Sequence, residues 1–150
     1  MENKDKNKDK NKNKNENKNI VIIGSSKFLD KIEKLKDYLI NKGYNVIEYP
    51  KKINHLDEKV YINRYKSFFS ALDSADEIFV ANFDKNEIKG YVGAESFAEL
   101  SFIVANNVLK NENRKIYLLN KPSEEVSSYF ELNSFIKLGI IKIWDEEITL

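Results

Sequence analysis

The chain has 150 residues, with 25 Lys and Arg against 24 Asp and Glu, no Cys and a single His. This composition excludes disulfides, a thiol nucleophile and thiolate or His-rich metal sites, and leaves carboxylates, hydroxyls and lysines for catalysis. No apolar run approaches the roughly 20 residues of a membrane span, and the N-terminus lacks the apolar core of a signal peptide, so we expect a cytoplasmic protein without a metal or other cofactor.

Residues 1–19 differ in composition from the rest of the chain. After Met1 they comprise seven Asn, seven Lys and four acidic residues, a net charge of 7 − 4 = +3. Such a segment has no apolar side chains to offset the entropy of ordering. We therefore expect a disordered tail over 1–19 and one folded domain over 20–150, whose net charge is +1 − 3 = −2. This charge gives no reason to expect a nucleic-acid partner, although a polyanion-binding tail is an alternative.

From Ile20 the sequence alternates predicted strands and helices. Short β-branched or apolar runs predict strands, and apolar residues at helical spacing predict helices. The predicted strands are 20–23, 44–49, 77–81, 116–119 and 140–144, and the predicted helices are 27–42, 59–72, 94–109 and 129–138. This alternation predicts an α/β fold with a doubly wound, five-stranded parallel sheet in the flavodoxin-like order 2-1-3-4-5. Ligands bind such sheets at the carboxyl ends of strands one and three, which directs attention to the loops 24–28 and 82–99.

The first of these loops, Gly24-Ser25-Ser26-Lys27-Phe28, has the composition of an anion site. Gly24 permits a tight turn, two hydroxyls and free helix N–H groups face the ligand, and Lys27 adds positive charge. The loop lacks the further glycines of a dinucleotide fingerprint or a Walker loop. Capping of the next helix by Ser26 explains the same sequence equally well.

The second loop, 82–92, leads into the third predicted helix. Gly90 and Gly93 bring the backbone close to any ligand there. Glu95 and Glu99 are four residues apart, so they share one helix face, and the apolar residues after Glu99 place this carboxyl at the entry to a buried helix. A buried glutamate has a raised pKa and can serve as acid, base or nucleophile, whereas an exposed face or a salt bridge is the alternative.

His55 and the aromatic residues of the second predicted helix each have a structural and a functional interpretation. His55 lies in a polar loop beside two acids, which predicts an exposed side chain. The second predicted helix carries aromatic residues that predict part of the core, or alternatively a stacking surface or a subunit contact. These are Tyr61, Tyr65, Phe68 and Phe69.

Over roughly residues 20–122 the sequence resembles nucleoside 2-deoxyribosyltransferase-like proteins. The resemblance is distributed over several elements rather than resting on one motif. It is carried by Ile20–Ile23 with the loop that follows, Ala75–Asn82, Gly90-Tyr91-Val92-Gly93, Phe97-Ala98-Glu99-Leu100 and Lys115–Asn120.

The resemblance implies a deoxynucleoside or nucleoside 5′-monophosphate as the substrate. Glu99 would attack the anomeric carbon, the base would leave, and another base or water would resolve the covalent deoxyribosyl–enzyme, as in a retaining glycosidase. Tyr91 or Tyr65 would orient the carboxylate, and Glu95 completes the predicted catalytic set. This chemistry needs no metal or cofactor.

Substrate contacts are expected from both loops, with Asp84 or Glu87 as an acid from the second. The expected binding residues are Gly24, Ser25, Ser26, Lys27, Phe28, Asn82, Asp84, Gly90 and Gly93. The resemblance also implies a homodimer or larger homo-oligomer whose neighbouring subunits complete the pocket. Phe68 and Tyr91 stand where the family carries acids, which favours hydrolysis of a nucleotide or, as an alternative function, a nucleotide-binding or sensing module without turnover.

Overall fold

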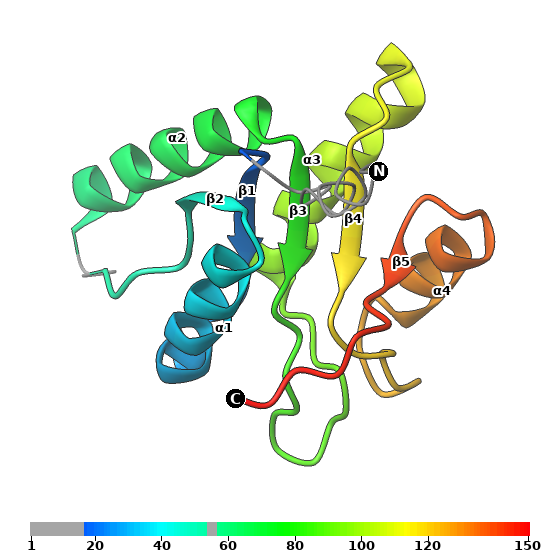
Figure 1. Cartoon of the computed structure of the whole chain (residues 1–150). Coiled ribbons are helices and arrows are strands. Elements are labelled where there is room, and N and C mark those ends of the chain that lie inside the picture. The colour runs from blue at the N-terminus through cyan, green and yellow to red at the C-terminus, as the bar shows by residue number, and fades with distance from the viewer. Residues whose placement is uncertain (1–16, 54–56) are drawn as a thin grey trace, which may run out of the picture.

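The computed structural model describes residues 17–53 and 57–150, so most of the predicted tail, and His55, lie outside the described residues. The strands are β1 (Asn19–Ile23), β2 (Asn45–Glu48), β3 (Glu77–Val80), β4 (Lys115–Leu118) and β5 (Lys142–Ile143). The helices are α1 (Leu29–Asn41), α2 (Glu58–Ser74), α3 (Ala94–Lys110) and α4 (Tyr129–Lys137), with a short 3₁₀ turn, η1, over Ser26–Phe28. All strand pairs are parallel, in the order β2-β1-β3-β4-β5 (Figure 1). The predicted fold class and strand order are confirmed.

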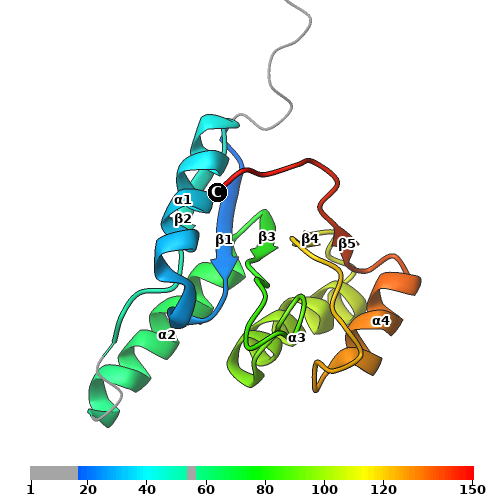
Figure 2. The same cartoon turned by 90° about the horizontal axis from the view of Figure 1, so that it is seen from below.

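The two faces of the sheet are covered by different elements (Figure 2). Because side chains alternate along a strand, Ile78 and Val80 of β3 face one side while Phe79 faces the other. The first side packs against α2, α3 and α4, and the second against α1 and the chain after β5. β1 and β3 are buried on both faces, which explains their continuous apolar sequences. Among the described residues, no helix is both long enough and apolar enough to cross a bilayer.

Most element boundaries lie within two residues of the predicted ones, and three of the differences have a clear local reason. Ordered structure begins before Ile20, since the Asn17 amide donates to Gly43 and Asn19 is the first residue of β1. The first helix begins with the 3₁₀ turn η1 and becomes α-helical only at Leu29. The last strand is shorter than predicted because the amides of Ile140 and Ile141 donate to a carbonyl at the end of α4 instead of to β4.

The loops that follow β3 and β4 are joined by a pair of asparagines. The Asn82 amide group donates to the Asn120 carbonyl at 2.6 Å and accepts from the Asn120 amide N–H at 3.0 Å. The Asn120 side chain returns a bond of 3.1 Å to the Asn82 carbonyl. Asn82 is 1% exposed and also donates to Gly90 at 3.3 Å. This network fixes the long loop that leads to α3.

We expect Asn82→Ala to lower the free energy of unfolding by about 2–3 kcal/mol, because it leaves the buried Gly90 carbonyl and the partly buried backbone groups of Asn120 without their partner. Urea denaturation measures this change. The control is Asn63→Ala on the exposed side of α2, which should change stability by less than about 0.5 kcal/mol. Equal effects of the two substitutions would contradict a structural role for the asparagine pair.

Candidate functional site

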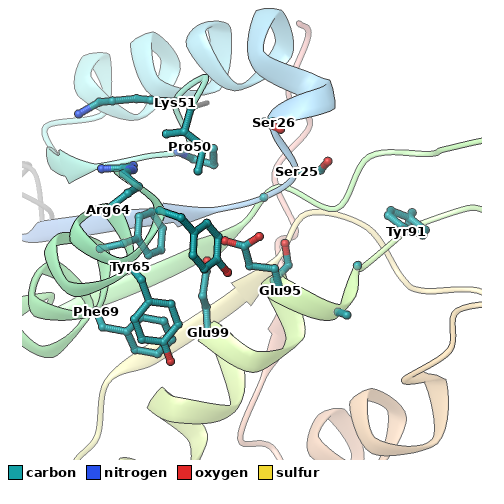
Figure 3. A pocket seen from close by; sticks show the side chains of 17 residues that line it. Ser25, Ser26, Pro50, Lys51, Arg64, Tyr65, Phe69, Tyr91, Glu95 and Glu99 are labelled. Carbon is teal, nitrogen blue, oxygen red and sulfur yellow. The ribbon is translucent and has the colours of Figure 1, made fainter. Parts of the chain in front are cut away.

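A cavity of about 190 Å³ lies at the carboxyl edge of the sheet. Its walls come from the loop after β1, the segment after β2, the central part of α2 and the first turns of α3 (Figure 3). It lies beside the carboxyl ends of β1 and β3, where the strand order changes direction and where this fold class binds its ligands. The cavity is therefore the candidate functional site.

Glu99 lies at the inner end of the cavity and is 8% exposed. Within the described residues, its carboxyl has neither a hydrogen-bond donor nor an ion-pair partner. Burial and the neighbouring charge of Glu95 raise its pKa to about 8, and the charge of Arg64 opposes this only in part. At neutral pH the empty site therefore holds Glu99 mainly as the protonated acid.

Glu48, at the end of β2, is a buried glutamate that has hydrogen-bond and ion-pair partners, and its pKa contrasts with that of Glu99. Burial raises its pKa, but hydrogen bonds from Arg64, the Tyr49 amide and Lys51 outweigh burial, and the pKa ends below its ordinary value. The Arg64 guanidinium contacts both carboxylate oxygens, at 2.9 and 3.1 Å, and donates to the Tyr49 carbonyl at 2.8 Å. Glu48 therefore belongs to a structural ion pair, whereas Glu99 has no hydrogen bond or ion pair among the described residues and is affected by Arg64 only through its more distant charge.

The wall formed by α2 is aromatic. The rings of Tyr65 and Phe69 are stacked with centroids 4.3 Å apart, and Phe102 of α3 supports Phe69 edge-on at 5.3 Å. Tyr61 lies one turn earlier, and the charge of Glu95 raises the pKa of its phenol. The rings of Tyr65 and Phe69 present flat apolar surface next to the carboxyl groups of Glu95 and Glu99 (Figure 3). Phe68, by contrast, belongs to the core beneath the wall as well as lining it.

Seven of the predicted site residues line this one cavity. They are Gly24, Ser25, Ser26, Tyr91, Gly93, Glu95 and Glu99. The cap of the turn after β1 is Ser25, not Ser26: the Ser25 hydroxyl accepts from the Lys27 amide at 3.2 Å. Figure 3 shows Tyr91 at the far end of the cavity from Glu99. There its ring lies 4.4 Å from the Lys85 ammonium, so a role in orienting Glu99 stays a prediction.

The other five predicted binding residues do not line the cavity, and all of them except the exposed Lys27 have side-chain or backbone contacts that stabilise the structure. Phe28 packs edge-on against Phe83 at 5.6 Å, and Lys27 is exposed beside it. Asp84 accepts a hydrogen bond of 2.9 Å from the Gly90 amide and so closes the loop after β3. Gly90 has φ +62°, and a Cβ there would lie 2.6 Å from a backbone carbonyl oxygen, so only glycine fits. The fifth, Asn82, belongs to the asparagine pair.

Sequence reasoning missed Arg64 and the segment after β2 as parts of the site. Arg64 is one of only two arginines among 25 basic residues, and it follows Tyr61 by three positions, which places both on one side of a helix. That spacing was the available signal. No local sequence pattern predicts that Pro50 and Lys51 line the cavity. They do so because β2, which they follow, lies beside β1 in the sheet.

Comparison of the chain with protein-family models, with curated proteins and with solved structures finds no match. Within residues 17–53 and 57–150, no three His, Asp or Glu side chains gather as metal ligands would. The chemistry of the site must therefore be inferred from its own residues.

Proposed function

We propose that the protein cleaves or transfers the N-glycosidic bond of a nucleoside or nucleoside 5′-monophosphate, with Glu99 as the nucleophile. The observation that carries the proposal is a buried carboxyl that has no hydrogen-bond or ion-pair partner among the described residues and faces a cavity that combines stacked aromatic rings with serine hydroxyls. Aromatic rings suit a base, and hydroxyls suit a sugar or phosphate. The resemblance to nucleoside 2-deoxyribosyltransferase-like proteins supports the same assignment of Glu99.

The reaction proceeds in two displacements. A carboxylate oxygen of Glu99 bonds to the anomeric carbon while the bond to the base nitrogen breaks, and the electron pair leaves with the base. Water or a second base then attacks the same carbon and releases Glu99. The pathway matches that of retaining glycosidases, in which a carboxylate traps an oxocarbenium-like centre.

A panel of nucleosides and nucleoside 5′-monophosphates, in ribo and deoxyribo forms, tests this function. Chromatography measures the free base released, with and without an acceptor base. Release that depends on the acceptor identifies a transferase, and release without it identifies a hydrolase. The absence of release from every substrate would contradict the proposal.

The pH profile gives a second test. As a nucleophile, Glu99 must be ionised, and the free enzyme holds its pKa at about 8. We therefore expect kcat/KM, which reports the free enzyme, to rise about tenfold for each pH unit below 8 and to level off above it. Rates measured from pH 5.5 to 9.5 check this, and a profile that falls over that range would assign Glu99 as a general acid instead.

Nucleotide binding without turnover is a second candidate function. The observation that favours it is the absence of any cation or donor on Glu99 among the described residues, because a protonated carboxyl suits a hydrogen bond to a bound ligand. A nucleotide that raises the melting temperature without releasing its base would select this candidate.

A homo-oligomer and a cytoplasmic location belong to the same proposal. Exposed apolar side chains on α2 and α3 support the oligomer, among them Ile62 at 45% and Leu109 at 81% exposed. Nucleosides and nucleotides are cytoplasmic metabolites, which supports the location. Sedimentation equilibrium tests the first and cell fractionation the second.

A further inference from the structure

The cavity holds two carboxyl groups that the protein leaves without cations. Glu95 and Glu99 both line it, one helical turn apart on α3. Neither forms an ion pair or a hydrogen bond with another described residue. When both are ionised, the two like charges repel each other along one helix face, and burial adds to the cost of ionising Glu99. A ligand with positive charge would remove both penalties.

The two cationic side chains at the cavity are already engaged elsewhere. Arg64 and Lys51 both pair with Glu48, at 2.9 and 3.2 Å. Figure 3 shows both side chains on the Pro50 side of the cavity, away from Glu95 and Glu99. The part of the cavity next to α3 is therefore acidic.

The aromatic wall favours the same kind of ligand. The stacked rings of Tyr65 and Phe69, with Tyr61 beside them, stand next to the carboxyl pair. Aromatic faces attract cations, most strongly where water is excluded. A flat cation could stack on the aromatic rings of α2 and at the same time pair with the carboxyl groups of α3.

The need to protonate the leaving base also favours a cationic ligand. A neutral base is a poor leaving group and needs a proton as it departs. The described residues that line the cavity include neither His nor Cys, so the acids they offer are carboxyl groups, phenols and the Lys51 ammonium. A base that already carries a fixed positive charge leaves as a neutral molecule and needs no acid.

We propose that the substrate is a nucleoside or nucleotide whose base carries a fixed positive charge, such as an N-glycoside of a pyridinium or of an N-alkylated purine. This proposal rests on the proposed function and specifies its substrate class. Glu99 forms a bond to the anomeric carbon, and the electron pair of the broken bond neutralises the cationic nitrogen. Water then attacks the ester, giving the free sugar, the Glu99 carboxylate and one proton. Approach of the cation also lowers the pKa of Glu99 and so favours its nucleophilic form.

Matched pairs of substrates isolate the charge. One pair is 7-methylguanosine and guanosine, and the other is nicotinamide riboside and its reduced, neutral dihydro form. Base release is measured at pH 8, with blanks without enzyme subtracted. We expect kcat/KM to be at least about tenfold higher for the cationic member of each pair.

Two variants test the source of the preference. Glu95→Gln should lower kcat/KM for the cationic substrates about tenfold more than for the neutral ones. The control is Glu131→Gln, which removes the corresponding charge from the exposed first turn of α4 and should leave the ratio unchanged. Its circular dichroism and that of Glu95→Gln show whether both variants fold.

The outcomes separate the two proposals. Equal or faster release from the neutral members, or a loss in Glu95→Gln confined to them, would overturn the charge preference and leave the proposed function intact. The absence of release from all four substrates and from the wider panel would overturn the proposed function together with this inference.

Discussion

Glu99→Gln is expected to lower base release by at least about 10³-fold, because the amide cannot attack the anomeric carbon. Such a loss corresponds to about 4 kcal/mol of transition-state stabilisation. The substitution keeps the size of the side chain and removes a carboxyl that has no partner among the described residues, so the variant should fold. Single-turnover base release measures the effect, with Glu131→Gln as the control for charge. Activity within tenfold of wild type would rule out Glu99 as the nucleophile.

Glu99→Ala distinguishes a nucleophile from a residue that merely shapes the cavity. Azide is a small anion that can enter the vacated space and attack the same carbon. We expect added azide to restore part of the base release in Glu99→Ala and to form a glycosyl azide. Base release that azide does not affect would argue for a structural role.

Glu99 should also make the free energy of unfolding depend on pH. The direction is opposite to that of a salt-bridged acid, which stabilises the fold more as pH rises. The folded state holds its pKa at about 8, against the ordinary value of 4.5 in the unfolded chain. Between these values folding takes up a proton, so the free energy of unfolding falls as pH rises from about 4.5 to 8 and is constant above. The full difference corresponds to on the order of 5 kcal/mol, of which about 3 kcal/mol falls between pH 5.5 and pH 8.

The comparison with Glu99→Gln isolates this effect, because the other titrating groups are common to both proteins. Relative to wild type, the variant should gain about 3 kcal/mol between pH 5.5 and pH 9. Urea denaturation at these two pH values measures it. A difference between the two proteins that does not change with pH would show that the Glu99 pKa is not raised in the folded state.

Much of the fold was predictable because it depends on patterns along the chain. Continuous apolar strands such as Ile20–Ile23 predict burial on both faces, and Gly43 correctly predicts where the first helix ends. The last strand was overestimated because apolar character at Ile140 and Ile141 does not reveal that their amides turn back to α4. Apolar sequence predicts burial, whereas hydrogen-bond partners depend on tertiary geometry.

The candidate site was predictable only in part, for the same reason. Ser25 and Glu99 lie next to the ends of predicted strands or helices, and the strand order brings them together. Asn82 and Asp84 also follow a predicted strand, but their side chains form hydrogen bonds that hold the loop after β3 and do not line the cavity. Arg64 lines the cavity and is held there by Glu48, a partner 16 residues away, which no local pattern shows.

The covalent role of Glu99 is tested most directly by a search for the sugar attached to its side chain. The protein is mixed with a substrate carrying fluorine at C2′, which slows the second displacement by destabilising the oxocarbenium-like centre. It is then quenched in acid, digested and analysed by mass spectrometry. We expect a peptide from the start of α3 that carries one sugar on Glu99 and is absent in Glu99→Gln. Base release without such an adduct, or with the sugar on another residue, would contradict this role.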